Sequence, residues 1–303
     1  MSGSYASRLS EYKNKGVCGL PEHVDTERRM TLNMSKLLDM VKAAKHIVVL
    51  TGAGISTSAG IPDFRGPSGI WTKEMEGTKT ANAKRAKRTS VAGKKRKLTP
   101  PVVDFDQAAP TLTHRALAFL VEHHKVQFVV TQNVDGLHKR SGLSRDHHAV
   151  LHGCVFTEVC VDCRTEHFRD HDVGGMSFQP TGRTCDVCSG KLCDSLLDWE
   201  DDLPEFDFER AQQHCQHADL VLTLGTSLRI EPAASLTTLA KKFAIVNLQE
   251  TPYDGQADLI LRAPVDDVMQ ALIDGLGFED HWDANSKPTI ERLWQRPERH
   301  DVD

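Results

Sequence analysis

Short apolar runs rich in β-branched residues recur along the chain, each bounded by polar or glycine-containing segments. Such runs are too short for buried helices, so they predict strands of a parallel sheet that is covered on both faces. The five predicted strands are His46–Leu50, Phe128–Thr131, Leu220–Leu224, Ala244–Leu248 and Leu259–Leu261.

Around these strands, apolar residues recur at three- and four-residue spacing, the pattern of a helix with one buried face. The predicted helices are Asn33–Lys45, Thr113–His124, Phe208–Cys215, Pro232–Lys242 and Val265–Leu276. Strands that alternate with helices connect through right-handed crossovers, which place helices on both faces of the sheet. The sequence therefore predicts an α/β fold with a doubly wound, Rossmann-like parallel sheet.

Two segments interrupt this alternation. Residues 73–98 contain ten Lys or Arg against two Glu and almost no apolar residue, which predicts a disordered basic insertion. Residues 154–200 carry paired cysteines and predict a small inserted module. At the two ends, residues 1–30 predict a loosely held N-terminal arm and residues 277–303 a C-terminal tail.

Composition narrows the class of protein. With 303 residues, of which 39% are hydrophobic and 26% charged, the chain fits a soluble globular protein with a sizeable core. The first thirty residues hold no sustained apolar run, so we expect no secretory signal. No segment approaches the roughly 20 apolar residues that span a bilayer. We therefore expect an intracellular protein, in which paired cysteines indicate a metal before a disulfide.

The paired cysteines have the spacing of a zinc site. Cys160-Val-Asp-Cys163 is followed, after 21 residues, by Cys185-Asp-Val-Cys188. Four thiolates complete a tetrahedron, so the zinc would be structural and would supply folding free energy to a module with few apolar residues. The alternative is four unrelated buried cysteines. The remaining cysteines lack such pairing and are expected to be small apolar residues: Cys18, Cys154, Cys193 and Cys215.

Glycine-containing or polar segments follow three of the predicted strands. Thr51–Gly60 contains glycines that would let the backbone approach a pyrophosphate. Thr57 stands where the G-x-G-x-x-G fingerprint has its third glycine, which argues against a plain dehydrogenase. Thr131–Asp135 and Leu224–Ser227 also follow strands. Because ligands bind at the carboxyl ends of strands in open α/β sheets, the three segments predict one nucleotide-binding crevice.

Together these motifs resemble the sirtuin family. The matching runs, in the family's order, are Gly52–Ser56, Gly60–Gly66, Thr131–His138, Leu151–Gly153, the four paired cysteines, Leu224–Ser227 and Ile245–Leu248. The likeness implies a sirtuin-type catalytic domain over residues 31–276. Asp198–Pro204 further resembles the nuclear, chromatin-associated branch of the family. The chain departs from the family's pattern at Cys154, where Asn is usual, and in its long basic insertion.

The resemblance implies an NAD-dependent protein-lysine deacylase that acts on acetylated or long-chain-acylated lysines, such as those of histone tails. NAD would be a co-substrate, and the products would be nicotinamide, the deacylated lysine and O-acyl-ADP-ribose. His152 matches the family's catalytic base, and an imidazole with a pKa near 6.5 suits that task. Without its Leu-His-Gly context, one of 15 histidines would more readily be a surface or core residue.

The NAD-binding residues are implied by the same motifs. Phe64 would shield the ribose from water, Trp71 would line the cofactor, and Asn133 would lie near the nicotinamide. The full set implied by the resemblance is Gly52, Ala53, Gly54, Thr57, Asp63, Phe64, Arg65, Trp71, Gln132, Asn133, Asp135, Gly225, Thr226, Ser227, Asn247, Gln249 and Val265. The alternative role for each polar residue at a strand end is a simple cap of that strand.

Two other functions stay open at this point. A protein mono-ADP-ribosyltransferase would activate NAD in the same way, and a non-catalytic chromatin module would only sense NAD or ADP-ribose. An intact His152 argues against the sensor. The clusters Lys84–Arg88 and Lys94–Lys97 predict nuclear import, with the cytoplasm as second choice, and contact with chromatin or nucleic acid. A solvated insertion without a partner is the alternative, and no membrane contact is expected.

Overall fold

The structure is a computed structural model that describes residues 5, 8–12, 15–77 and 103–297. Both basic clusters lie outside the described residues. Residues 73–77 are described, and they continue a helix that spans 70–77, so the prediction of disorder from residue 73 is wrong at that end. The buried side chain of Trp71 anchors the first turn of this helix. Within the described ranges, no helix has the length and apolar character to span a bilayer.

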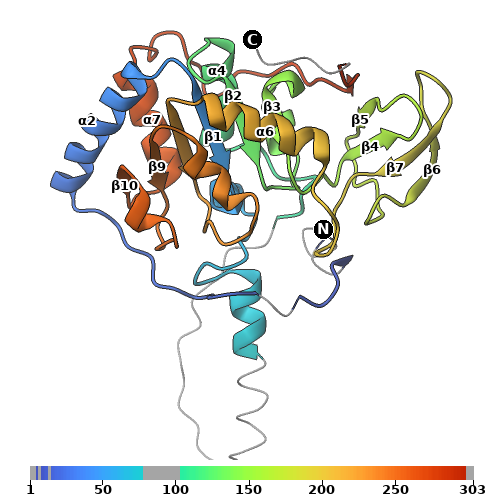
Figure 1. The fold of residues 1–303 in the computed structure, drawn as a ribbon, viewed down its shortest axis with the longest axis horizontal. Coiled ribbons are helices and arrows are strands. Elements are labelled where there is room, and N and C mark those ends of the chain that lie inside the picture. Colours follow the sequence, from blue (N-terminus) through green and yellow to red (C-terminus); the bar gives the residue numbers. More distant parts are fainter. Residues whose placement is uncertain (1–4, 6–7, 13–14, 78–102, 298–303) are drawn as a thin grey trace, which may run out of the picture.

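A six-stranded parallel sheet forms the centre of the molecule, in the strand order β10-β9-β8-β1-β2-β3 (Figure 1). Its strands are β1 (Ile47–Thr51), β2 (Phe128–Thr131), β3 (His148–Val150), β8 (Leu220–Leu224), β9 (Phe243–Val246) and β10 (Leu259–Leu261). The order runs from β1 through β2 and β3 to one edge, and through β8, β9 and β10 to the other. The predicted doubly wound sheet is therefore confirmed, and β3 is added to the five predicted strands.

Helices cover both faces of this sheet (Figure 1). One face packs against α2 (Glu27–Ala43), α4 (Leu112–Glu122) and α7 (Val265–Gly275). The other face packs against α6 (Glu205–His217) and the 3-10 helix η3 (Ala234–Leu239). The shorter helical elements are η1 (Ala53–Ala59), α5 (Leu137–Arg140), η2 (Arg145–His147) and η4 (Asp254–Gln256). α2 begins six residues before the predicted start because the Thr26 hydroxyl caps it, accepting from the Arg29 amide.

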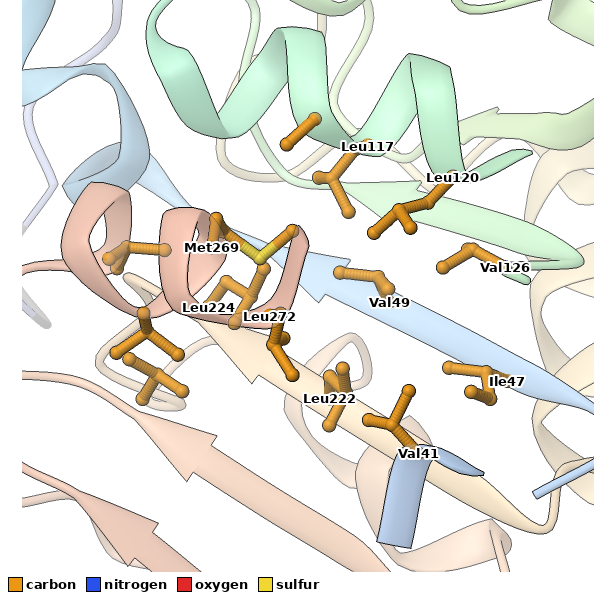
Figure 2. Packing of buried hydrophobic residues seen from close by; sticks show 14 of the residues in the cluster. Val41, Ile47, Val49, Leu117, Leu120, Val126, Leu222, Leu224, Met269 and Leu272 are labelled. Atoms are coloured by element: carbon orange, nitrogen blue, oxygen red, sulfur yellow. The ribbon is translucent and has the colours of Figure 1, made fainter. Parts of the chain in front are cut away.

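Alternation along β1 explains why its sequence is apolar throughout. Ile47 and Val49 point to the core under α2, α4 and α7, whereas Val48 and Leu50 point to the core under α6 and η3. Figure 2 shows Val49 and Ile47 packed among side chains of α4, β8 and α7. A polar residue at any of these positions would be buried on one face or the other.

The predicted helix Pro232–Lys242 is wrong as an α-helix, because the structure has the six-residue 3-10 helix η3 there. Hydroxyl side chains bond to carbonyl groups three residues back in this segment. Ser235 Oγ donates to the Pro232 carbonyl at 2.8 Å, and Thr237 Oγ1 donates to the Ala234 carbonyl at 2.9 Å. Such local bonds compete with the regular α-helical pattern and favour the tighter turn.

The cysteine-containing segment forms a separate antiparallel sheet with the strand order β11-β5-β4-β7-β6, on the right in Figure 1. Its strands are β4 (Thr157–Cys160), β5 (Glu166–Phe168), β6 (Pro180–Thr184), β7 (Lys191–Asp194) and β11 (Leu293–Trp294). β11 comes from the predicted C-terminal tail and pairs with β5. The buried Arg145 guanidinium bonds to Glu166 of this sheet and to Asp207 of α6, which ties the module to the main sheet.

The described part of the N-terminal arm makes specific contacts, in contrast to the predicted loose arm. The Tyr12 ring stacks on the Trp199 ring at 4.4 Å between centres, and the Trp199 indole donates to the Ser10 carbonyl at 3.1 Å. Arg8 forms an ion pair with Asp172 of the cysteine module at 2.6 Å. Aromatic residues in a polar segment, here Tyr12, are the sequence signal that could have indicated packing.

Candidate active site and metal cluster

The carboxyl ends of four neighbouring strands line one pocket of about 580 Å³. Gly52 follows β1, Gln132 follows β2, Gly225 follows β8 and Asn247 follows β9. The direction of winding reverses between β1 and β8, and in open α/β sheets ligands bind at the carboxyl ends of the strands beside such a reversal. The pocket lies where the polar strand ends predict a ligand site.

Gly54 and Gly225 bring two strand-end loops into backbone contact. The Gly54 amide donates to the Gly225 carbonyl at 2.8 Å, and the Gly52 amide donates to the Leu224 carbonyl at 3.1 Å. A Cβ at Gly54 would lie 2.7 Å from the Gly225 oxygen, and Gly225 has φ of +59°. Both positions therefore need glycine. The wall they form is bare backbone, which a diphosphate can approach closely.

The structure brings together all the residues that the motifs imply for NAD and catalysis. Lining the main pocket are Gly52, Ala53, Gly54, Asp63, Phe64, Arg65, Trp71, Gln132, Asn133, Asp135, His152, Gly225, Thr226, Ser227, Asn247 and Gln249. The other two, Thr57 and Val265, line a smaller cavity of about 120 Å³ that shares Asp63 and Asn247 with the main pocket.

His152 is held in one tautomer by a backbone carbonyl. Its Nδ1 lies 2.9 Å from the Gln132 carbonyl oxygen, which can only accept, so Nδ1 carries the hydrogen. Nε2 is then the unprotonated nitrogen. Burial lowers the pKa of His152, while the bond to Gln132 acts in the opposite direction. The imidazole is therefore neutral at pH 7, and Nε2 can accept a proton as a general base.

Ser56 links two residues of the predicted nicotinamide end. Its hydroxyl donates to the Asp135 carboxylate at 2.7 Å and accepts from Asn133 Nδ2 at 3.4 Å. Asn133 Nδ2 also donates to the Gly52 carbonyl at 3.0 Å, which ties the end of β2 to the loop after β1. Burial raises the pKa of Asp135, and the bonds from the Leu137 amide and Ser56 oppose that rise. Ser56 is missing from the predicted set, although its place in a matching motif could have indicated it.

The predicted cofactor loop folds around Trp71. The Trp71 amide donates to the Phe64 carbonyl at 3.0 Å, and the two rings lie 4.9 Å apart. The Arg65 guanidinium lies 4.4 Å from the centre of the Trp71 ring. Asp63 Oδ1 accepts from the Gly66 amide at 2.9 Å, and burial raises the pKa of this carboxyl. Trp71 is therefore both a pocket wall and the anchor of its loop.

Four cysteine sulfurs of the small module lie within 4.8 Å of one another. Cys160 Sγ is 3.4 Å from Cys188 Sγ, and Cys163 Sγ is 3.6 Å from Cys185 Sγ, so neither pair is a disulfide. Two thiolates on a tetrahedral zinc, each at about 2.3 Å from the metal, lie about 3.8 Å apart. The donor set and its spacing thus fit a closed, structural zinc site.

Residues that sequence reasoning did not select also line the pocket. Tyr5 packs against Phe105 with ring centres 6.4 Å apart, and both line the apolar end of the pocket. No local pattern marks either residue, because their places depend on segments distant in the sequence. Asp198, Asp201 and Asp202 line the pocket as well. They belong to the run that resembles the nuclear branch, so that motif could have indicated them.

Three buried histidine rings lie edge to face beside the pocket. Because they are buried without charge, we expect the free energy of unfolding to fall in mild acid. Burial lowers the pKa of His114 and His148, and that of His138 to about 3. In the unfolded chain they titrate near 6.5, so below that pH the unfolded state binds more protons than the folded state. We expect each to lower the free energy of unfolding by up to about 1.4 kcal/mol per pH unit as the pH falls from 6.5. His46 and His214 act in the same direction.

Urea unfolding at pH 7.5, 6.5 and 5.5 measures this loss, and the His148→Gln variant should show a shallower pH dependence. If the free energy of unfolding stays constant over this range, the three buried rings are not held uncharged in the folded state.

Three comparisons with known proteins, of sequence family, of related sequences and of solved structures, point to the same family. The sequence model of the Sir2 family matches residues 52–232. NAD-dependent protein deacetylase SRT1 of Oryza sativa subsp. indica is 42% identical over 279 residues, which cover 90% of this chain and 54% of that protein. NAD-dependent protein deacetylase Sirt6 of Drosophila melanogaster is 41% identical over 305 residues, which cover 95% of this chain and 90% of that protein. The chain thus spans about half the length of the plant relative.

Solved structures agree with the fold. One of them, a Sir2–p53 peptide–NAD+ complex, has a TM-score of 0.57 and 30% sequence identity, and the match covers 81% of this chain and 99% of that one.

Proposed function

Because the chain belongs to the Sir2 family, we propose that it is an NAD-dependent protein-lysine deacylase that produces nicotinamide, deacylated lysine and O-acyl-ADP-ribose. The observation that carries this proposal is the neutral His152, fixed by Gln132 with Nε2 unprotonated, in the same pocket as the bare backbone wall at Gly54 and Gly225. An enzyme that cleaves NAD and transfers its ADP-ribose needs a base and a diphosphate-binding wall in the same pocket.

We assign the pocket residues to the two ends of NAD as follows. Backbone at Gly54 and Gly225 would hold the diphosphate, Asn247 and Gln249 the adenosine ribose, and Asn133 with Asp135 the nicotinamide ribose. NAD supplies an activated ribose carbon from which nicotinamide leaves. His152 Nε2 would take a proton from a ribose hydroxyl, and Phe64 with Trp71 would keep water from the ribose.

Acidic side chains of the pocket support a basic peptide as the acyl-lysine substrate. Asp198, Asp201, Asp202 and Glu205 line the pocket, and Glu200 in the same segment is exposed. Such carboxylates attract Lys and Arg side chains that flank the modified lysine. Acylated histone tails have this chemistry, and we propose them as the substrate class.

Zinc would be held by Cys160, Cys163, Cys185 and Cys188 and would have a structural role. All four donors are protein thiolates, so a zinc at this site keeps no open position for a substrate or water.

A mono-ADP-ribosyltransferase is the second candidate, because the same NAD end of the pocket would serve it. The apolar end at Tyr5 and Phe105 favours the deacylase, since an acyl chain needs such a wall and a small nucleophile does not. A protein that only senses NAD transfers no proton, so it would not require the general base that a fixed, neutral His152 provides.

The deciding experiment incubates the protein with NAD and histone-tail peptides that carry acetyl, decanoyl or myristoyl lysine. Mass spectrometry should find equal amounts of nicotinamide, free lysine peptide and O-acyl-ADP-ribose. ADP-ribose attached to protein in place of these products would favour the transferase. No nicotinamide release with any peptide would refute both enzymes.

We propose a nuclear location for the protein, based on the clusters Lys84–Arg88 and Lys94–Lys97. Changing their eight Lys and Arg to Gln should move a fluorescently tagged protein toward the cytoplasm. The same change should flatten the salt dependence of DNA binding, because fewer phosphate counterions are released. Peptide deacylation should persist in this variant. If location and DNA binding both stay unchanged, the basic insertion has no such partner.

A further inference from the structure

Two threonine hydroxyls and a histidine form a buried chain of hydrogen bonds beside the pocket. Thr51 and Thr131 end the neighbouring strands β1 and β2 and are paired in the register. Thr51 Oγ1 lies 2.9 Å from Thr131 Oγ1 and 3.0 Å from His138 Nε2. The Asn133 amide donates to Thr131 Oγ1 at 3.1 Å. Thr51, Thr131 and His138 are each at most 2% exposed.

Groups that can only donate fix two of these hydrogen bonds. The Asn133 amide can only donate, so Thr131 Oγ1 accepts from it, and the Thr51 hydroxyl lies within reach of the same oxygen at 2.9 Å and of the Val130 carbonyl at 3.4 Å. Thr51 Oγ1 then accepts from His138, whose hydrogen is on Nε2. In the opposite tautomer the hydrogen would be on His138 Nδ1, which is buried and has no partner among the described residues. A buried N–H without an acceptor is costlier and rarer than an unused lone pair.

Burial also keeps the histidine uncharged. It lowers the pKa of His138 to about 3, so the ring is neutral at physiological pH. His138 is therefore a permanent N–H donor on a short α-helix, α5, and it does not line the main pocket. Its side-chain hydrogen bonds lead to the pocket through Thr51, Thr131 and the backbone of Asn133.

We infer that His138 is a positioning residue, which through Thr51 and Thr131 fixes the Asn133 turn for binding the nicotinamide end of NAD. The inference rests on the proposed function, which gives Asn133 that role. Asn133 lines the pocket, its amide is anchored on Thr131 Oγ1, and its side chain is held by the bond from Nδ2 to the Gly52 carbonyl. Freeing its amide would allow the turn to shift and would weaken that contact.

The test removes the hydroxyls with residues of the same shape. Thr51→Val and Thr131→Val keep a β-branched side chain at the strand ends. The matched control is Thr223→Val, because Thr223 is buried in the neighbouring strand β8 and its hydroxyl donates to the Ala244 carbonyl at 3.0 Å, outside the chain. The measurements are KM for NAD, inhibition by nicotinamide, kcat and melting temperature.

Thr51→Val and Thr131→Val should raise KM for NAD and the nicotinamide inhibition constant about fivefold to tenfold, the change expected for one lost neutral hydrogen bond. The kcat should change much less. Thr223→Val should lose similar thermal stability with both constants unchanged. His138→Gln, which retains an N–H donor, should stay closer to wild type in KM than His138→Leu.

Equal constants for the two valine variants and Thr223→Val would overturn the inference and leave a purely structural role. If Thr131→Val does not fold, Thr131→Ala is measured in its place. Wild-type protein that releases no nicotinamide would instead refute the proposed function. In that case the inference is judged by calorimetric affinity for NAD, where the two valine variants should bind more weakly than Thr223→Val.

Discussion

Replacing His152 by alanine is expected to lower kcat for deacylation by at least about a hundredfold, the typical contribution of a general base. The physical reason is the loss of the unprotonated Nε2 that the Gln132 carbonyl orients. Calorimetric affinity for NAD should remain close to wild type, because the diphosphate wall at Gly54 and Gly225 is backbone. The melting temperature should also be retained, since alanine leaves no unpaired charge.

The control is His147→Ala, which removes an exposed histidine near the same edge of the sheet. Its kcat should equal that of the wild type. More than a few per cent of wild-type turnover in His152→Ala, with the peptide and NAD both saturating, would show that His152 is not the base.

Replacing Cys185 by serine is expected to remove zinc and to unfold the small module. Three thiolates do not complete the tetrahedron, and the module has little apolar core to replace the metal. The loss should exceed about 4 kcal/mol, which lowers the melting temperature by roughly 10 °C or more. Native mass spectrometry should find one zinc on the wild-type chain and none on the variant.

Cys193→Ser is the matched control, because Cys193 lies on β7 of the same module outside the four-sulfur cluster. It should keep its zinc. Hydrogen exchange in Cys185→Ser should rise over β4–β7 first, and activity should fall as a consequence. Wild-type protein purified without zinc, yet with a protected module, would count against the metal site.

Apolar runs predicted the central sheet because each of its strands is buried on both faces. β2, β8 and β10 have the predicted bounds. β3 was not predicted, because its three residues begin with the polar His148 and do not form an apolar run. The strands of the cysteine module were also missed. β6 alternates between exposed and half-buried residues and contains Pro180 and Gly182, so its sequence has no apolar run that would predict a strand.

The site was predictable wherever a motif carries its own backbone requirement. The glycines after β1 and β8 and the Leu-His-Gly run at His152 are of this kind. Tyr5 and Phe105 were not predictable, because each reaches the pocket only through packing between distant segments. The motif that contains Ser56 could have indicated that it belongs to the site, but its bonds to Asn133 and Asp135 depend on the strand order, which brings β1 beside β2.

The contact between Gly54 and Gly225 also has a consequence for folding. The two glycines lie far apart in the chain, and only completed pairing of β1 with β8 brings them together. Contacts of such long sequence separation form late and raise the contact order of the domain. Affinity for a dinucleotide is therefore a property of the fully folded sheet and of no shorter segment. A bound dinucleotide would in turn stabilise the native state as a whole, so the free energy of unfolding should rise with the dinucleotide concentration.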